Sequence, residues 1–212
     1  MALEDKYSEF EKFMEENRSK RKFEQSVELA INFRSVDFSK QVNRLNLDIL
    51  LPNGKGKTSK IALFATDKAL IEKAGGSDIE ILDGNAIAAM ANDKEKLAQL
   101  LNYVLVAQQN LMPTIARYLG PYLGPRNKMP KPFMPGQDLT KMSNDINKSI
   151  SIRNKGKFLP TVHCVVGSEK MDSRKIYDNV KEVVSAVTKK TGVNHIRSVY
   201  VKLTMSKPFK LV

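Results

Sequence analysis

The chain has 212 residues, a single cysteine and the apolar content of an ordinary globular protein. No apolar run approaches the ~20 residues that span a bilayer, and the N-terminus lacks the basic-then-apolar order of a signal peptide. Cys164 alone cannot form an internal disulfide or a cysteine-rich metal cluster. We therefore expect a soluble, cytoplasmic protein of one large or two small domains, without metal or cofactor.

The formal net charge of +12 is unevenly placed along the chain. Residues 1–56 contain 10 Lys/Arg and 10 Asp/Glu, residues 57–148 contain 12 and 9, and residues 149–212 contain 13 and 4. A basic excess in one third of the chain indicates a face that binds a polyanion by neutralising phosphates. A membrane surface is the rival anion, but this third contains no strongly amphipathic, Lys-rich helix with bulky apolar residues. The charge therefore favours nucleic acid over membrane.

The two ends of the chain share one pattern. A helix is predicted over residues 3–20, where Leu3 and later apolar residues recur at helical spacing. Residues 25–33 and 198–204 alternate strictly, which predicts strands with one buried and one open face. Strands are also predicted at 45–51, at 149–153 and 161–166 around a turn at 154–157, and a helix at 172–188.

The middle of the chain alternates strands with helices. Strands are predicted at residues 60–65, 77–82 and 103–107, and helices at 66–74 (ending at Gly75-Gly76), 85–92 and 94–101. This order indicates a parallel sheet. The fold class is therefore α/β with two domains, a discontinuous α+β domain over 1–56 and 149–212 and an inserted domain over 57–148.

Residues 118–133 repeat Leu-Gly-Pro twice and then place Arg126, Lys128 and Lys131 between prolines. Proline fixes its own φ and disfavours helix at the residue before it. We therefore predict a stiff, basic, irregular loop, which is either a functional segment or a rigid surface connector.

The predicted open faces carry the polar side chains with most binding potential. Ser198, Tyr200, Lys202 and Thr204 share one face of their strand, as Ser26, Glu28 and Asn32 do on the earlier one. Hydroxyl, amide, lysine and aromatic groups can contact ribose and phosphate. The alternative is an ordinary solvated sheet face. Phe23, next to four basic residues, is expected in the core at a strand edge unless it stacks on a base.

Enzymatic motifs are weak. Gly56-Lys57-Thr58 resembles the end of a phosphate-binding loop, but position 51 is leucine where that motif needs glycine. His163 and Cys164 are adjacent on a strand, so their side chains point to opposite faces and cannot form a thiolate–imidazole pair. We expect no catalytic activity and no metal site.

Several segments of the chain together resemble the motifs of one protein family. Residues 119–132, Leu-Gly-Pro-Tyr-Leu-Gly-Pro-Arg-Asn-Lys-Met-Pro-Lys-Pro, resemble the signature of the ribosomal protein that forms the mobile side stalk of the large subunit, numbered first among large-subunit proteins. Matching motifs follow the family order at 22–28, 52–54, 163 and 198–205. The resemblance covers nearly the whole chain. The chain is short and lacks long tails, and in this it is similar to the archaeal branch of the family.

The resemblance implies a split βαβ domain built from both chain ends and an inserted Rossmann-like three-layer domain. It implies a free monomer located in the ribosome. Its partners would be a helix–loop site of large-subunit ribosomal RNA, the exit-site transfer RNA and its own messenger, which it would repress. The implied RNA-facing residues are Lys22, Phe23, Ser26, Glu28, Ser198, Thr204, Met205 and, through its backbone, Ser206. The open-face Tyr200 and Lys202 join them, with Arg153, His163, Arg126 and Lys128 as secondary contacts.

One departure and three alternatives stay open. The family commonly has glycine after Thr-Met, whereas this chain has Ser206, so a backbone needing glycine would be strained there. Met205 either contacts RNA or joins the apolar set of its strand. The rivals to a ribosomal role are a messenger-binding repressor whose ribosomal role is secondary and a Rossmann-type, nucleotide-dependent enzyme.

Overall fold

The computed structural model describes residues 6–74, 79–134, 137–154 and 158–212. The chain forms two compact units, unit 1 from Met1–Lys57 with Asn147–Val212 and unit 2 from Thr58–Ile146. The expectations for Leu3, for Gly75-Gly76 and for most of the turn at 154–157 lie outside the described residues. None of the described helices is long and apolar enough to cross a bilayer.

Unit 1 is built around an antiparallel sheet with the strand order β10-β9-β1-β8. Burial alternates residue by residue along β1, and Val199, Val201 and Leu203 of β9 are buried as predicted. The strands are β1 (Ser26–Phe33), β8 (Thr161–Ser168), β9 (Ile196–Leu203) and β10 (Phe209–Lys210).

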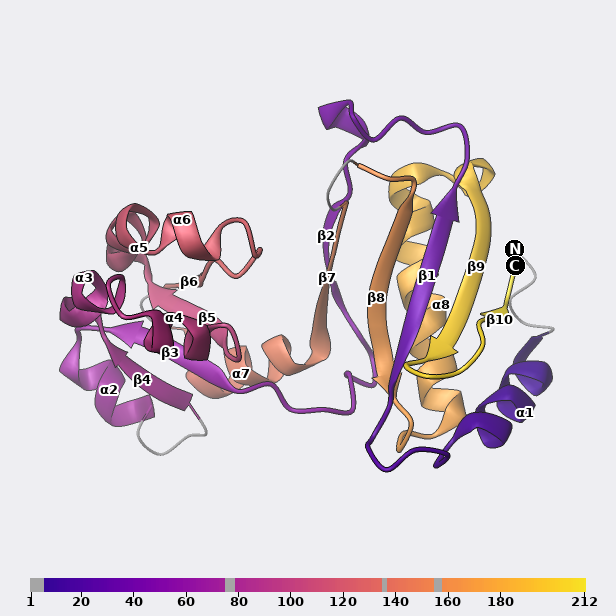
Figure 1. The fold of residues 1–212 in the computed structure, drawn as a ribbon, viewed down its shortest axis with the longest axis horizontal. Coiled ribbons are helices and arrows are strands. Elements are labelled where there is room, and N and C mark those ends of the chain that lie inside the picture. The colour runs from indigo at the N-terminus through magenta and orange to yellow at the C-terminus, as the bar shows by residue number, and fades with distance from the viewer. Residues whose placement is uncertain (1–5, 75–78, 135–136, 155–157) are drawn as a thin grey trace. The chain divides into compact units, whose positions relative to one another are not determined.

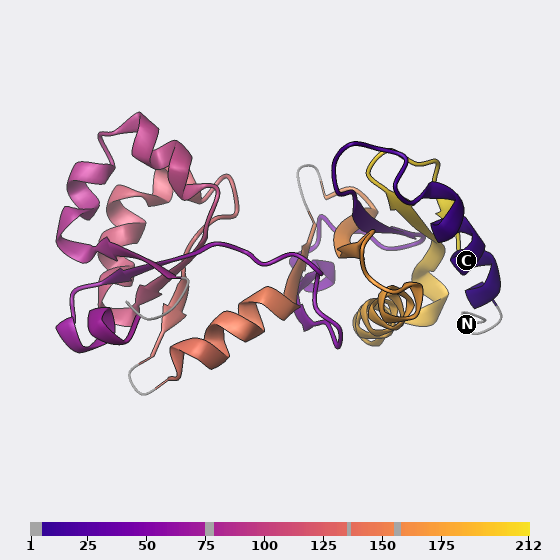
Figure 2. The same ribbon diagram turned by 90° about the horizontal axis from the view of Figure 1, so that it is seen from below.

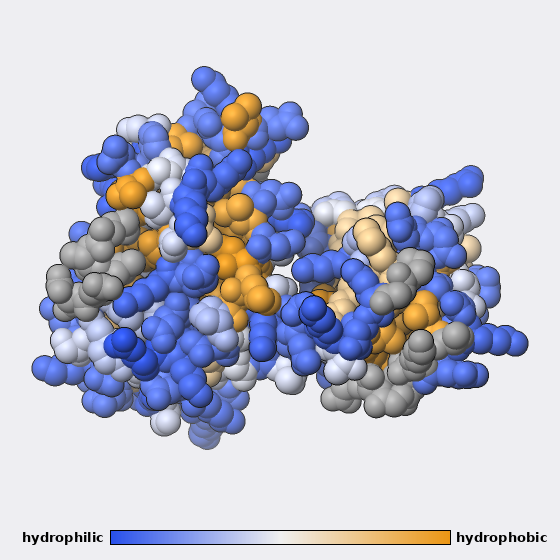
Figure 3. Space-filling model, turned by 180° about the vertical axis from the view of Figure 1, so that it is seen from behind, coloured by the Kyte–Doolittle hydropathy of each residue, from blue (hydrophilic) through white to orange (hydrophobic). Residues whose placement is uncertain are grey.

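Two helices, α1 (Tyr7–Asn17) and α8 (Ser173–Thr191), pack against this core. The predicted apolar stripe of α8 is buried, and the Asp172 side chain accepts a hydrogen bond from Arg174 N at the helix start. Figure 1 shows α8 behind the sheet, so the opposite face is left without a helix. Seen from the α8 side, the surface of unit 1 is mainly hydrophilic (Figure 3).

A second, two-stranded sheet pairs β2 (Asn46–Leu50) with β7 (Ser149–Arg153). The prediction that 149–153 and 161–166 are strands is confirmed, but they do not pair with each other. β7 pairs with β2, while β8 pairs with β1. Short 3-10 turns lie at Gln41–Asn43 and Val193–His195.

Unit 2 contains a parallel sheet with the order β4-β3-β5-β6. Helices lie on both faces, as Figure 2 shows, and each face has its own apolar cluster. All five residues of β3 are buried because both sides of the strand are covered. The strands are β3 (Ile61–Ala65), β4 (Ile79–Asp83), β5 (Val104–Gln108) and β6 (Lys131–Phe133). The helices are α2 (Lys68–Ala74), α3 (Ile87–Met90), α4 (Lys94–Leu100), α5 (Met112–Tyr118), α6 (Gly120–Leu123) and α7 (Leu139–Lys148), with 3-10 turns at Gly84–Ala86 and Gln109–Leu111.

The prediction of one irregular loop over residues 118–133 is wrong at both ends of the segment and holds for residues 124–130. Residues 112–118 and 120–123 are helical, and Lys131–Phe133 forms the edge strand β6. Pro121 occupies the first turn of α6, where proline is tolerated because its missing N–H has no partner in the helix. Each proline of the repeat follows a glycine, which removes the Cβ that would clash with the proline ring. Leu119 and Leu123 are buried and anchor the segment to the unit 2 core.

Candidate RNA-binding face

The open face of sheet β10-β9-β1-β8 is a regular array, because β1 pairs in register with strands on both sides. Glu28 of β1 lies opposite Lys202 and Val165, and Ala30 lies opposite Tyr200 and His163. Residues directly opposite on neighbouring strands have Cβ atoms ~5 Å apart. The cross-strand rows therefore bring together Glu28, Tyr200, Lys202 and His163, which the sequence assigned to separate motifs.

The row around Ala30 leaves room between two rings. His163 is exposed and Tyr200 is half-buried, one on each side of the small Ala30. Two strand spacings of ~4.8 Å separate their backbones. Aromatic and imidazole rings are groups on which unpaired bases stack. His163 is therefore part of the face.

In the row of Thr161, Asn32 and Ser198, the side chains hydrogen-bond one another. Asn32 Nδ2 donates to Ser198 Oγ at 3.0 Å, and Thr161 Oγ1 donates to Asn32 Oδ1 at 2.9 Å. Ser198 is only 7% exposed. It lies on the predicted face, where it is buried and its hydroxyl accepts the hydrogen bond from Asn32.

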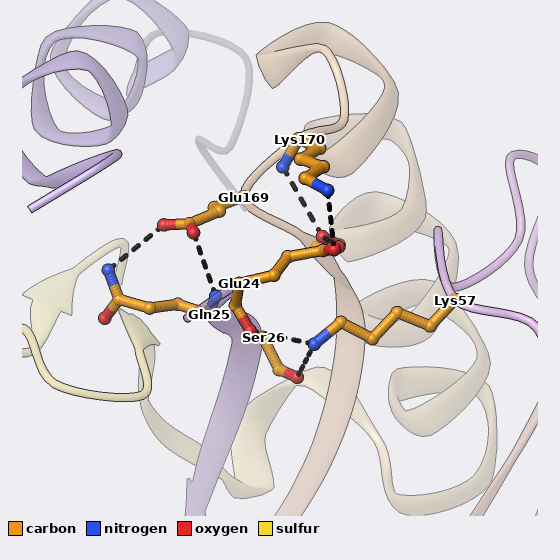
Figure 4. Close-up of polar contacts among 7 residues, drawn as sticks. Glu24, Gln25, Ser26, Lys57, Glu169 and Lys170 are labelled. Carbon is orange, nitrogen blue, oxygen red and sulfur yellow. Dashed lines mark hydrogen bonds and ion pairs between the residues drawn. The ribbon is translucent and has the colours of Figure 1, made fainter. Parts of the chain in front are cut away.

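At the other end of the face, Ser26 is surrounded by three polar contacts. Thr204 Oγ1 accepts from Ser26 N at 3.2 Å, and Thr204 N donates to Ser26 O at 3.1 Å, extending the ladder past β9. Lys57 Nζ donates to Glu24 O at 2.9 Å and lies 3.4 Å from Ser26 Oγ, as Figure 4 shows. An ammonium group thus stands beside the hydroxyl that the sequence singled out. Lys57 was not predicted as a site residue, because in the sequence it stands out only within an incomplete phosphate-loop motif.

Two large apolar side chains project beside this end. Phe23 is 51% exposed and Met205 is 56% exposed. Both core interpretations, for Phe23 at a strand edge and for Met205 in the alternating set of β9, are therefore wrong. The strand β9 ends at Leu203, so alternation no longer dictates the direction of Met205. Lys22, next to Phe23, is also exposed.

Ser206 fits its position without glycine. The described non-glycine residues with positive φ are Ser19, Ser35, Asn127 and Phe158, so Ser206 does not need the left-handed conformation. Its Oγ accepts a hydrogen bond from Leu203 N at 2.9 Å and closes the turn after β9. The expected strain at Ser206 is absent.

The other predicted secondary contacts belong to other elements than this sheet. Arg153 is exposed at the end of β7. Arg126 and Lys128 belong to unit 2. The Arg126 guanidinium stacks 4.0 Å from the centre of the Tyr122 ring, and Lys128 Nζ lies 3.4 Å from Tyr103 O.

Further observations concern the ionisable groups of unit 1. Burial raises the pKa of the Cys164 thiol to about 12, so it carries no thiolate near neutral pH. Among the described residues no group of three His, Cys, Asp or Glu side chains is arranged to hold a metal ion. A hydrogen bond from Ser168, with Lys170 nearby, holds the pKa of Glu24 below its usual value.

Comparison with known proteins shows which proteins this chain is similar to. Residues 14–207 match the model of the ribosomal protein L1p/L10e family. The chain is 38% identical over 202 residues to large ribosomal subunit protein uL1 of Thermoplasma acidophilum, covering 93% of this chain and 92% of that protein. It is 39% identical over 201 residues to uL1 of Archaeoglobus fulgidus, covering 92% of each. The uL1 of Pyrococcus horikoshii is 39% identical over 191 residues, covering 87% of this chain and 85% of that protein.

Proposed function

Because the chain belongs to the ribosomal protein L1p/L10e family and is a non-catalytic, RNA-binding constituent of the large ribosomal subunit, we propose that it binds ribosomal RNA on the open face of unit 1. The observation that carries this proposal is the sheet face without a helix, bordered by the exposed Phe23 and Met205. An exposed apolar side chain beside polar strands is a feature of contact surfaces.

The face offers two kinds of interaction. Lys22, Lys57 and Lys202 supply positive charge for phosphates, which gives affinity that depends on salt. The Ser26 hydroxyl and the Glu28 carboxylate can hydrogen-bond ribose hydroxyls or base edges, which distinguish RNA from DNA and one RNA shape from another. Phe23, Tyr200, His163 and Met205 offer flat or polarizable surfaces for unpaired nucleotides.

Several finer assignments rest on the resemblance given by the sequence motifs. We place the protein in the side stalk of the large subunit, near the exit-site transfer RNA, and as a monomer when free. Arg153 in unit 1, with Arg126 and Lys128 in unit 2, would make secondary RNA contacts. Repression of its own messenger would use the same unit 1 face, because one preformed surface binds any RNA that presents the same shape.

Co-sedimentation with large ribosomal subunits stripped of this protein tests the proposal. Rising salt should release the protein progressively, with a negative slope in a plot of log affinity against log salt concentration. A matched series with small subunits controls for non-specific attraction to RNA. Equal retention on both subunits, or retention that ignores salt, would contradict specific binding through a basic RNA-facing surface.

A competition experiment separates the ribosomal and messenger roles. A transcript of the protein's own messenger should displace the protein from large-subunit ribosomal RNA if both RNAs occupy the same face. The Met205→Ala variant should then lose affinity for both RNAs together. Loss for one RNA alone would assign the two activities to different surfaces.

A further inference from the structure

Beneath the exposed end of the RNA-binding face lies a buried polar pair, Gln25 and Glu169. Gln25 is 2% exposed and Glu169 is 9% exposed, so neither is placed to contact RNA. Gln25 N donates to Glu169 Oε1 at 3.0 Å, and Gln25 Nε2 donates to Glu169 Oε2 at 3.1 Å. In return, Glu169 N donates to Gln25 O at 3.0 Å. Figure 4 shows both side-chain contacts to Glu169.

This pair connects three segments that converge at one end of the sheet. Glu169 follows β8, and Gln25 precedes β1 directly after the segment that carries Lys22 and Phe23. The side-chain amide oxygen of Gln25, Oε1, accepts a hydrogen bond from Met205 N at 3.1 Å. The buried amide is therefore the direct link between the Phe23 segment and the Met205 turn.

In the hydrogen bonds that link Glu169, Gln25 and Met205, chemistry fixes which group donates and which accepts. A carboxylate only accepts hydrogen bonds, so Glu169 turns the amide nitrogen of Gln25 toward itself. That orientation leaves Gln25 Oε1 facing the Met205 N–H. Gln25 Nε2 also donates to Asn17 O at 3.4 Å, a longer bond than the one to Glu169. Glu169 is thus the main partner that orients Gln25 so that the Met205 backbone finds an acceptor.

We propose that Gln25 and Glu169 are positioning residues that preorganise the two exposed side chains, Phe23 and Met205, for RNA binding. This inference rests on the proposed function of the unit 1 face. The physical reason is that a surface held in its bound conformation loses less conformational entropy when its ligand binds. The two residues act on RNA through the Met205 turn.

The variant Glu169→Gln tests the proposal against electrostatics. Removing a negative charge should by itself favour RNA binding. Our inference predicts the opposite, a loss of about tenfold in affinity, the size expected when one hydrogen bond of a buried pair is lost. The new amide at position 169 has one acceptor where Glu169 had two. If Gln25 keeps its orientation, an N–H of the new amide faces an N–H of residue 25; if the Gln25 amide turns over, its NH₂ group faces Met205 N instead. Affinity is measured by filter binding to a transcript of the protein's own large-subunit ribosomal RNA.

The double variant Glu169→Gln with Gln25→Glu provides a rescue. It reverses the pair and restores both a donor–acceptor contact between the two side chains and an acceptor for Met205 N. Its net charge equals that of the wild type. We expect its affinity to return to within about threefold of the wild-type value, well inside the tenfold that corresponds to a lost hydrogen bond.

Asn179 provides the matched control. It is another fully buried amide of unit 1, and its Nδ2 donates to Gly54 O and Val166 O at 2.8 Å each, away from Met205. The variant Asn179→Leu should lower the melting temperature yet leave RNA affinity unchanged when binding is measured well below that temperature.

Three results would overturn the inference. The first is binding by Glu169→Gln that is as tight as that of the wild type or tighter. The second is a double variant that does not recover affinity. The third is a loss of affinity in Asn179→Leu as large as that in Glu169→Gln. Failure of the wild type itself to bind the transcript would instead overturn the proposed function, on which this inference depends.

Discussion

Thr204 and Met205 are neighbours in sequence but have different surroundings. Met205 projects from the turn after β9 with 56% of its surface exposed. Thr204 Oγ1 accepts a hydrogen bond from Ser26 N at 3.2 Å and is half-buried. Substitutions at the two positions should therefore separate RNA binding from folding stability.

Met205→Ala should weaken RNA binding by about tenfold or more. Its melting temperature should hardly change, because substitutions of exposed side chains usually alter stability by less than ~0.5 kcal/mol. Met134→Ala is the matched control, since Met134 is 51% exposed but lies in unit 2. Binding isotherms and melting curves on both variants check this, and equal affinity of the two variants would remove Met205 from the site.

Thr204→Ala should affect both properties. Loss of the acceptor for Ser26 N should cost about 1 kcal/mol of stability, in addition to weaker RNA binding. The alternation of the sequence suggested that Thr204 contributes only to binding, and the bond to Ser26 changes that expectation. Thr204→Ser keeps the hydroxyl and should retain both stability and affinity. Denaturant unfolding in which the two variants lose the same stability would contradict a role for the hydroxyl.

Glu24 should give unit 1 a pH-dependent contribution to stability. Ser168 and Lys170 hold the pKa of the folded state below its usual value of 4.5. A lowered pKa contributes stability above the unfolded value, and this contribution is lost as pH falls through the folded pKa. The stability difference between wild type and Glu24→Gln, measured by urea unfolding, should thus be present near neutral pH and vanish in acid. A stability difference between wild type and Glu24→Gln that grows as the pH falls would contradict a lowered pKa of Glu24 in the folded state.

Among the elements, those with local periodicity were predictable. The alternation of β1 and β9 and the apolar stripe of α8 each follow from residues close in sequence, and the structure has them as expected. The pairing of β7 with β2 instead of β8 was not predictable, because partners across ~100 residues are selected by the whole fold. The polar link from Glu169 through Gln25 to Met205 was missed for the same reason, since it joins three distant segments.

The helix α6 was missed because the Gly-Pro pairs at 120–121 and 124–125 were interpreted as incompatible with helix. Gly124 has φ −57° and ψ −56° and precedes Pro125, so it needs a helical conformation where a Cβ would be crowded. A Cβ at Gly124 would also lie 2.8 Å from Gly120 O. At Gly120 no atom outside its neighbours lies within 4 Å of the added Cβ.

Gly124→Ala should therefore destabilise unit 2 by about 1–3 kcal/mol, the usual cost of overpacking. Gly120→Ala should cost less, because only the following proline opposes it. Chemical unfolding of both variants gives the comparison. If Gly120→Ala proved the more damaging, the tight approach at Gly124 would not be what requires glycine there.

At the scale of the molecule, each unit has an apolar core of its own residues. The core of unit 1 joins residues from both chain ends, whereas the two clusters of unit 2 come only from the inserted segment. A unit with its own core can fold alone. The proposed RNA-binding residues Phe23, Glu28, Tyr200 and Met205 all lie in unit 1, so binding and folding should be separable from unit 2.

The most direct measurement is the affinity of each unit alone for large-subunit ribosomal RNA. One protein joins residues 1–57 to 147–212 through a short linker, and the other contains residues 58–146. The first should fold and bind within about tenfold of the intact chain, since only secondary contacts are removed. The second should fold and bind weakly, despite Arg126 and Lys128. Tight binding by residues 58–146, together with weak binding by a folded unit 1, would contradict the account.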